Sequence, residues 1–413
     1  MTLIKTSILT AISTVIKVLV GFVINKVISV YIGPSGLAII GQLQNFLNTA
    51  LTFSNGAITQ GVVKYTAEYK DIEQKSKIFS TSVMVSLICS SIISILLFLF
   101  NDYFAILILK NIQYSSVFTV LSFTVFLFAL NIILLSILNG QKEIKKFILV
   151  SISSSLFSLL FTSFLIIKLS LIGALYALVA NQSVIFFVTL LFVIKSRWFK
   201  WEYFSKGIDR DSLVKLGKFS LMALTSALMI PVSELIIRDY IGETLSWDSA
   251  GYWQGIMYIS KMYLLVVTTS LGIYYLPKLS EITDNKELKE EIKNGYKIII
   301  PIVAIMALGI YLSRDLVIEI AFSSDFIMMR ELFKWQLIGD VIKIISWLLA
   351  YLMLAKAMTK LFIISEIIFT ISWITFAILG VKYFGLVGVT YAFSLNYFLY
   401  LIFVFIYFKK VLR

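Results

Sequence analysis

Residues 11–36 read AISTVIKVLVGFVINKVISVYIGPSG, a long apolar run that carries two lysines and ends in a tight turn. A second apolar run covers residues 37–63, and a charged segment follows it. About 20 apolar residues are enough to cross a bilayer as a helix. The stretch therefore predicts two successive membrane spans, and it places Lys17 in the middle of the first.

Runs of this kind recur along the whole chain, which indicates an all-α integral membrane protein. Hydrophobic residues make up 59% and charged residues 14% of the sequence, whereas soluble domains have about half and a quarter. The runs are too long and too uniformly apolar for the alternating strands of a membrane barrel. Twelve spans are predicted, over residues 8–31, 37–62, 78–100, 115–139, 147–167, 172–194, 216–237, 249–276, 296–313, 333–355, 361–381 and 386–408.

The composition also limits the chemistry that the protein can perform. The chain has no histidine and a single cysteine, Cys89, within an apolar run. This excludes histidine bases, histidine metal ligands and an intrachain disulfide. We expect no cofactor, no metal and no enzymatic activity. The net charge of +13 does not indicate nucleic acid, because an excess of cations in a membrane protein usually marks its cytoplasmic loops.

The distribution of lysine and arginine predicts the orientation. Of the 36 cations, 25 lie in the termini and in the loops after even-numbered spans, 7 lie in the other loops, and 4 lie within spans. Cytoplasmic loops carry the excess of positive charge. Both termini are therefore expected in the cytoplasm. Within the cytoplasmic part, residues 280–297 predict an amphipathic surface helix, with Asp284 and Glu287 at capping-box spacing and Leu288 and Ile292 on its apolar stripe.

Motifs recur at an offset near 215 residues, which indicates an internal duplication. The segment LIGALYA at residues 171–177 returns as LVGVTYA at residues 386–392, and Asn181 returns as Asn396. Each half holds an even number of spans, so both halves enter the membrane in the same orientation. The predicted domains are an N-terminal six-helix lobe, residues 1–205, and a C-terminal six-helix lobe, residues 206–413.

The second span carries a polar seam. Its members are Asn45, Asn48, Thr52, Asn55 and Thr59. Their spacing alternates between three and four residues, so all five would share one face of a continuous helix. We favour a seam that lines a cavity and binds substrate, and the alternative is hydrogen bonding between packed helices.

Two lysines lie within the first span. A charge near the bilayer centre costs about 2.5–3.5 kcal/mol, and every carboxylate of the first half lies in a predicted loop. We expect Lys17 to line an aqueous cavity and bind substrate, with a structural contact to carbonyls or to the other half as the alternative. Lys26 is expected to snorkel to the interface or to join the substrate site. The serines of the fifth span, Ser151, Ser153, Ser154, Ser155 and Ser158, are interpreted as close helix packing.

The second half combines cations with carboxylates inside its spans. Glu234 and Arg238 are spaced for a local ion pair on the seventh span, and Arg238 is also a candidate substrate contact. Lys261 is expected as a cavity cation in the eighth span. Asp340 and Lys343 are expected to neutralise each other in the tenth span. Glu366 is expected to pair with Lys343 or to carry protons, so Glu234, Asp340, Lys343 and Glu366 are candidates for ion coupling or structural ion pairs.

Four segments resemble those of the Wzx-type flippases, which belong to the multidrug/oligosaccharidyl-lipid/polysaccharide (MOP) exporter superfamily. They are YIGPSGL at residues 31–37, GVVKYTAEY at 61–69, FSLMAL at 219–224 and RELFKWQLIGDVIK at 330–343. The resemblance implies twelve transmembrane helices in two six-helix bundles, related by a pseudo-two-fold axis along the membrane normal around a V-shaped central cavity. Related lipid II flippases hold the diphosphate with cations in spans one, two and eight, and Lys17 and Lys261 fit spans one and eight.

The resemblance also implies a function. Such proteins move an undecaprenyl-diphosphate-linked oligosaccharide, an O-antigen unit or the enterobacterial common antigen intermediate lipid III, from the cytoplasmic to the periplasmic leaflet of the bacterial inner membrane. The implied partners are membrane lipid and the polysaccharide polymerase and chain-length regulator of the same pathway. Two alternatives remain open: a multidrug exporter of organic cations from the same superfamily, and a polysaccharide polymerase.

The predicted orientation can be measured with phosphatase fusions. Alkaline phosphatase joined to Arg413 is expected to be inactive, because the enzyme matures only in the periplasm and the C-terminus is predicted to be cytoplasmic. A truncated fusion after Lys168, in a loop predicted to be periplasmic, is the matched control and should be active. High phosphatase activity of the fusion at Arg413 would contradict the prediction.

Overall fold

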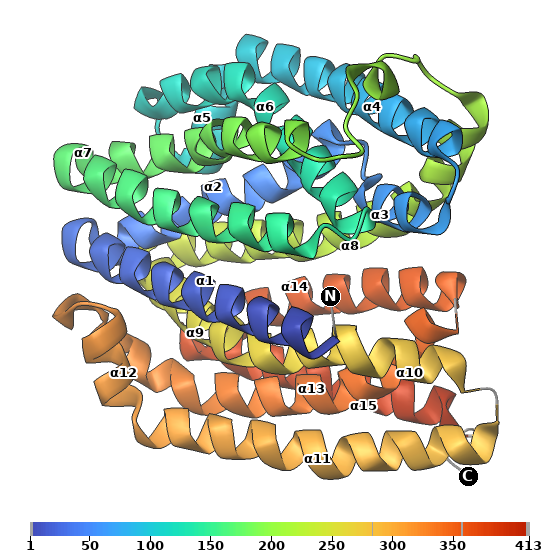
Figure 1. Cartoon of the computed structure of the whole chain (residues 1–413). Coiled ribbons are helices and arrows are strands. Elements are labelled where there is room, and N and C mark those ends of the chain that lie inside the picture. The colour runs from blue at the N-terminus through green and yellow to red at the C-terminus, as the bar shows by residue number, and fades with distance from the viewer. Residues whose placement is uncertain (1–2, 283, 357, 410–413) are drawn as a thin grey trace. The chain divides into compact units, whose positions relative to one another are not determined.

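A computed structural model describes residues 3–282, 284–356 and 358–409. Over these residues the protein is all-helical, without β-strands (Figure 1). The first part of the chain forms α1 (Leu3–Tyr31), α2 (Gly33–Ser54), α3 (Thr59–Glu68), α4 (Ile72–Leu99), α5 (Asn101–Leu109), α6 (Ser115–Gly140) and α7 (Ile144–Ile194). The second part forms α8 (Arg210–Thr244), α9 (Trp247–Ser270), α10 (Leu276–Glu281), α11 (Asn285–Leu312), α12 (Arg314–Ala321), α13 (Phe333–Ala355), α14 (Thr359–Phe384) and α15 (Val387–Tyr407).

Short helical turns link several of these helices. They are the 3-10 segments Ile112–Tyr114, Trp201–Phe204 and Ser324–Leu332, and a π-helical segment, Leu271–Tyr275. The start of α8 is fixed by Asp209, whose carboxylate accepts the backbone N–H of Ser212 at 2.8 Å. This hydrogen bond holds the pKa of Asp209 below its usual value, because it stabilises the charged form.

Eight segments of the described chain are long and apolar enough to cross a membrane. They are Ile12–Tyr31, Ile72–Leu99, Ile112–Gly140, Ile144–Ile194, Lys286–Leu312, Ser324–Ala355, Thr359–Phe384 and Val387–Tyr407. The fourth consists of two helices, because the backbone at Ser170 is not helical, and these two match the predicted spans 147–167 and 172–194. The second, seventh and eighth predicted spans coincide with α2, α8 and α9, which are not among the eight. The total of twelve spans therefore stays a prediction.

The chain divides into two compact units. The N-terminal unit comprises Met1–Ile32 and Ile39–Val232, and the C-terminal unit comprises Gly33–Ala38 and Ser233–Arg413. In the N-terminal unit, α1 and α6 pack along α7, and α4 packs along α6. Its buried side chains include Phe79 of α4. The predicted boundary between two six-helix lobes, after residue 205, stays a prediction.

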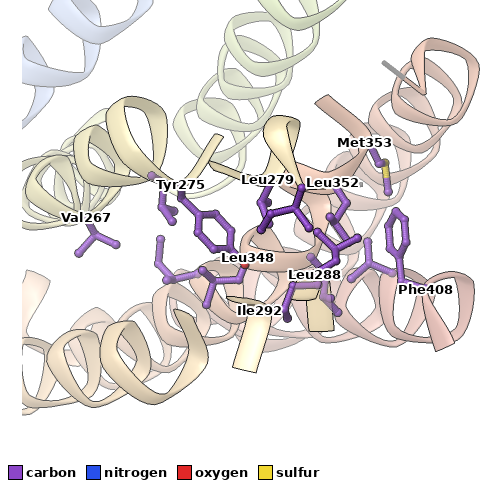
Figure 2. Close-up of a cluster of buried hydrophobic side chains, with 14 of the residues drawn as sticks. Val267, Tyr275, Leu279, Leu288, Ile292, Leu348, Leu352, Met353 and Phe408 are labelled. Atoms are coloured by element: carbon purple, nitrogen blue, oxygen red, sulfur yellow. The ribbon is translucent and has the colours of Figure 1, made fainter. Parts of the chain in front are cut away.

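The core of the C-terminal unit includes the apolar stripe predicted for residues 280–297. Leu288 and Ile292 were expected on the apolar stripe of a surface helix, and both are buried in a cluster with Tyr275, Leu348 and Phe408 (Figure 2). Asp284 does cap the helix, because its carboxylate accepts the backbone N–H groups of Lys286 and Glu287, each at 3.1 Å. The helix then runs on to Leu312 without interruption. Most of the predicted segment forms the first turns of α11, where the apolar stripe is buried and Lys286, Lys289 and Lys293 are exposed. The amphipathic character predicted for this segment is therefore confirmed.

A break between α2 and α3 corrects the predicted polar seam. α2 ends at Ser54, and Gly56 and Ala57 have left-handed backbone, with φ of 66° and 55°. The side chain of Asn55 accepts the backbone N–H of Ala57 at 3.0 Å, which stabilises the turn. Asn55 and Thr59 therefore do not continue the face of α2. The seam that remains on this helix consists of Asn45, Asn48 and Thr52.

The duplication recurs in three structural details. Ser170 and Gly385 both have positive φ, 51° and 62°, at the turn between two helices. Gly173 and Gly388 then lie so close to the preceding helix that a Cβ atom would approach the carbonyl oxygens of Leu165 and Gly380 to 2.0 and 1.9 Å. An asparagine–serine hydrogen bond follows in each unit, Asn181 with Ser158 and Asn396 with Ser372. Each unit thus contains its own copy of the positive-φ turn, the close glycine and the asparagine–serine hydrogen bond.

The close contact at Gly388 predicts a large effect of a single methyl group. Gly388→Ala is expected to destabilise the protein by about 1–3 kcal/mol, because the Cβ atom would overlap the backbone of Gly380. Gly309→Ala is the matched control, since its Cβ atom would meet nothing within 4 Å in α11. Thermal unfolding in detergent measures both. Equal melting temperatures for Gly388→Ala and wild type would show that the two backbones are not in contact.

Candidate anion-binding sites

The N-terminal unit contains a cavity at Lys17 that has both polar and apolar lining residues. The cavity has a volume of about 340 Å³ and lies between α1, α6 and α7. Its polar lining residues are Lys17, Ser151, Ser154, Ser155, Ser158 and Asn181. Val20, Gly21, Ile24, Leu135, Phe147, Val150 and Ile185 complete the wall. Lys17 thus lines the same cavity as four serines and an asparagine.

Lys17 carries the positive charge of this cavity. Among the described residues, no carboxylate forms an ion pair with its ammonium group and no hydrogen bond reaches it. Several serine hydroxyls nearby donate to the α7 backbone or bond to another side chain, as Ser155 does to the carbonyl of Ser151 at 3.0 Å. An ammonium group beside hydroxyls suits an anion or a sugar, because both accept its hydrogen bonds.

The serine cluster has a second feature beside the packing expected from the sequence. Ser151 and Ser158 bond to side chains of neighbouring helices, and four of the five serines, all but Ser153, also line the cavity. Their spacing of three to four residues places them on one face of α7. A row of serines on one face of α7, in the same half of the chain as Lys17, was the signal that could have identified these serines as cavity-lining residues. Lys26 is absent from the lining residues, and its role in binding stays a prediction.

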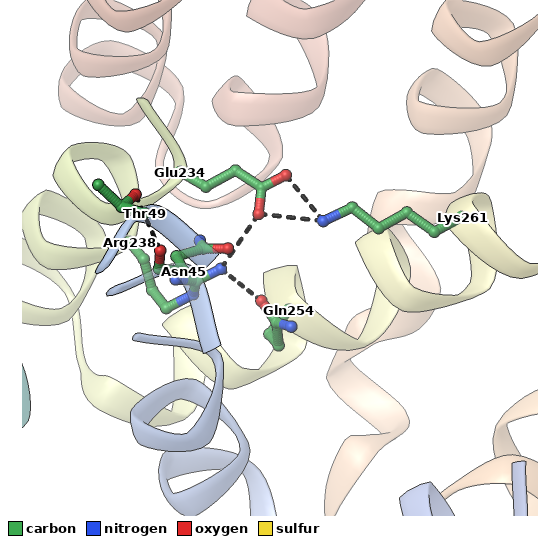
Figure 3. A network of polar contacts seen from close by, with 6 residues as sticks. All are labelled: Asn45, Thr49, Glu234, Arg238, Gln254 and Lys261. Carbon is green, nitrogen blue, oxygen red and sulfur yellow. Dashed lines mark hydrogen bonds and ion pairs between the residues drawn. The ribbon is translucent and has the colours of Figure 1, made fainter. Parts of the chain in front are cut away.

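The C-terminal unit contains a network of charges centred on Glu234 of α8 (Figure 3). Lys261 of α9 donates to both carboxylate oxygens of Glu234, at 2.8 and 3.0 Å. Arg238 lies one turn beyond Glu234 and approaches it to 3.7 Å, so the predicted i,i+4 contact is present. Lys261 was expected as a cavity cation, which stays a prediction, and its ion pair with Glu234 was not predicted. The partner lies 27 positions away on another helix, so it was not visible in the spacing of residues.

The surroundings of Arg238 explain how the network is held. Arg238 is fully buried, donates to the side-chain carbonyl of Gln254, and lies 5.4 Å from the ring centre of Trp253. A buried charge is stabilised only when it is paired and hydrogen-bonded. Glu234 supplies the counter-charge and Gln254 an acceptor. Arg238 thus anchors Glu234, and its predicted direct contact with substrate stays a prediction.

Asp340 and Lys343 do not form the expected ion pair. The buried carboxylate of Asp340 accepts hydrogen bonds from Ser260 at 2.7 Å, Tyr263 at 3.0 Å and Gln336 at 3.3 Å. The ammonium of Lys343 lies over the rings of Trp347, Tyr397 and Phe393, at 4.7, 5.4 and 5.9 Å from their centres. Hydroxyl and amide donors contact Asp340 directly and aromatic faces contact Lys343 directly, while the two charges still interact electrostatically.

The substrate and coupling roles predicted for the remaining residues stay predictions. In the described structure, Glu366 and Lys343 interact electrostatically without a direct ion pair, and the role of Glu366 stays a prediction. The seam residues Asn45, Asn48 and Thr52 lie on α2, where the hydroxyl of Thr52 donates to the carbonyl of Asn48 at 2.8 Å and that of Thr49 to the carbonyl of Asn45 at 3.1 Å. No cluster that could hold a metal ion occurs among the residues that the structure describes.

Solved structures with similar folds are transporters. The inward-facing form of a MATE family multidrug resistance transporter of the MOP superfamily aligns with a TM-score of 0.83 and 15% identity, over 96% of this chain and 94% of that one. The lipid II flippase MurJ, in an inward closed form, aligns with a TM-score of 0.74 and 17% identity, over 98% and 87%. At these identities the likeness concerns the fold, which is that of the MOP superfamily.

Sequence comparison gives more similar relatives. The chain is 28% identical to the lipid III flippase of Escherichia coli (strain K12) over 403 residues, which cover 97% of this chain and 96% of that protein. The lipid III flippase of Shigella flexneri matches to the same extent. These relatives confirm the resemblance seen in the sequence motifs. The family profile described as polysaccharide biosynthesis protein matches residues 32–331, most of the sequence, and the chain therefore belongs to the polysaccharide biosynthesis protein family.

Proposed function

We propose that this protein is a flippase that moves a lipid-linked oligosaccharide across the bacterial inner membrane. The observation that carries the proposal is the match to lipid III flippases. The match covers 97% of this chain and 96% of the relative from Escherichia coli. The protein is a multi-pass membrane transporter and not an enzyme, in keeping with these relatives. The substrate we propose is an undecaprenyl-diphosphate-linked O-antigen unit or the enterobacterial common antigen lipid III.

The two cationic sites support an acidic headgroup as cargo. A diphosphate and several sugars cannot cross hydrocarbon alone, because each charge and each unsatisfied polar group costs several kcal/mol there, roughly 2.5–3.5 for a single charged side chain on insertion scales. Lys17 offers an ammonium group among serine hydroxyls, and Lys261 offers one that is 54% exposed. These groups can replace water around phosphate oxygens and sugar hydroxyls. The polyprenyl tail would remain in the lipid.

The internal duplication supports transport by alternating access. Two like-oriented halves that rock against each other open a site to one side of the membrane at a time. The repeated helix turns at Ser170 and Gly385 support such halves. We further propose cytoplasmic termini, and contacts with the polysaccharide polymerase and chain-length regulator of the same pathway.

An exporter of organic cations is the second candidate of the same fold. The MATE family transporters share the fold at 15% identity, and identity at that level does not extend to the cargo. The N-terminal cavity argues against a cationic cargo, because Lys17 would repel it. A polysaccharide polymerase is not supported by any feature of the two sites.

Transport of the diphosphate lipid by purified protein tests the proposed function. In proteoliposomes, the chain is expected to expose lipid III to an impermeant glycosidase faster than protein-free vesicles do. Ethidium, an organic cation, serves as the competing cargo. Ethidium efflux without any movement of lipid III would favour the exporter and contradict the flippase.

Lys17 and Lys261 are expected to contribute more to the transport rate than an exposed lysine outside the two sites. Lys17→Ala and Lys261→Ala should each lower the flipping rate by about tenfold, because a hydrogen bond to a charged group contributes about 1.5–3 kcal/mol. Lys382→Ala, an exposed lysine at the end of α14, is the matched control and should keep the wild-type rate. Wild-type rates for the double variant of Lys17 and Lys261 would exclude both as substrate contacts.

A further inference from the structure

The cation of the C-terminal network is reachable, but its counter-charge is not. The Lys261 side chain is 54% exposed, whereas the Glu234 side chain is 6% exposed. The ammonium nevertheless directs hydrogen bonds at both oxygens of Glu234, at 2.8 and 3.0 Å (Figure 3). A free anion that approaches Lys261 therefore meets a donor group that is already engaged by a carboxylate of the protein.

The network is built so that Lys261 can exchange its partner. Two cations, Lys261 and Arg238, share the single carboxylate of Glu234. If Lys261 turns away, Glu234 keeps the buried guanidinium of Arg238 as its counter-charge, and Arg238 keeps its hydrogen bond to Gln254. The exchange leaves no buried charge without a counter-charge. In most buried ion pairs, the loss of one partner is costly because the other charge remains buried and unpaired.

A carboxylate with two oxygens on one ammonium presents the same acceptors as a phosphate group. We propose that Glu234 occupies Lys261 in place of the substrate anion, and that it sets which anions can bind. The inference rests on the proposed function and concerns its specificity. Glu234 is attached to the chain, so it competes at an effective concentration on the order of millimolar or above. A phosphodiester headgroup, with one negative charge, does not displace it, whereas a diphosphate does.

This arrangement addresses a difficulty that any flippase for a rare lipid faces. Ordinary phospholipids are abundant around the protein and also carry phosphate. An open ammonium group would bind their headgroups first. The ion pair with Glu234 prevents phosphodiester headgroups from binding to Lys261, whereas an anion of higher charge displaces the carboxylate. Specificity then comes from a competing interaction within the protein. Glu234 is thus a specificity-determining residue, and Lys261 is the group that contacts the anion.

Two substitutions of Glu234 distinguish the effect of its contact with Lys261 from the effect of its negative charge. Glu234→Asp keeps the charge beside Arg238 but shortens the side chain, so it no longer reaches Lys261. Glu234→Gln keeps the length and removes the charge. Both are expected to bind undecaprenyl diphosphate about tenfold more tightly than wild type, because the ammonium no longer loses a charged hydrogen bond on binding. Both should also gain affinity for phosphatidylglycerol. Native mass spectrometry of the full chain, released from neutral-lipid nanodiscs, measures the dissociation constants.

Two controls make the outcome decisive. Glu243→Gln removes one negative charge from the same helix, at an exposed position, and should leave both affinities unchanged. In a Lys261→Met background, Glu234→Gln should give no gain. Unchanged affinity in both Glu234 variants overturns the inference, and so does a gain that persists without Lys261. The proposed function fails separately, if the wild-type chain does not flip lipid III.

Discussion

The cost of a charge in hydrocarbon governs how this protein is built. Each ionised side chain within a span needs water, a counter-charge or a polarisable surface. The described spans use all three solutions. Lys17 opens onto a cavity lined by serines, Arg238 and Lys261 share Glu234, and Lys343 lies over three aromatic rings. Only the first two solutions leave an ammonium group within reach of a ligand, which is why the candidate sites are there.

The two units derive from one repeat but use it differently. Both keep the positive-φ turn, the close glycine and the asparagine–serine bond. At the shared offset of 215 residues, however, Ser154 corresponds to Phe369 and Ser158 to Trp373. Phe369 packs against Tyr400, with ring centres 4.8 Å apart. Small residues leave a cavity in one unit where large rings fill the equivalent space in the other. The two halves of the repeat thus differ in the size of the side chains at these positions.

Much of this could be read from the sequence, because helices in a membrane are long and their charges are rare. The helix positions, the duplication and the contact between Glu234 and Arg238 follow from local spacing. Features that depend on packing between helices could not be read. The pairing of Lys261 with Glu234 joins two helices, and a serine-rich face predicts close packing as well as a cavity wall. The break after Ser54 was hidden because the polar spacing continues through it.

The polarity of α8 and α9 has a consequence for how the chain is made. These helices follow one another directly and are not among the segments apolar enough to enter a bilayer alone. The translocon releases segments sideways into lipid, and each charge delays that step. When Lys261 meets Glu234 inside the channel, both charges are masked at once. A hairpin whose charges are matched costs less to place in lipid than either helix alone, so the same contact lowers the cost of inserting both helices.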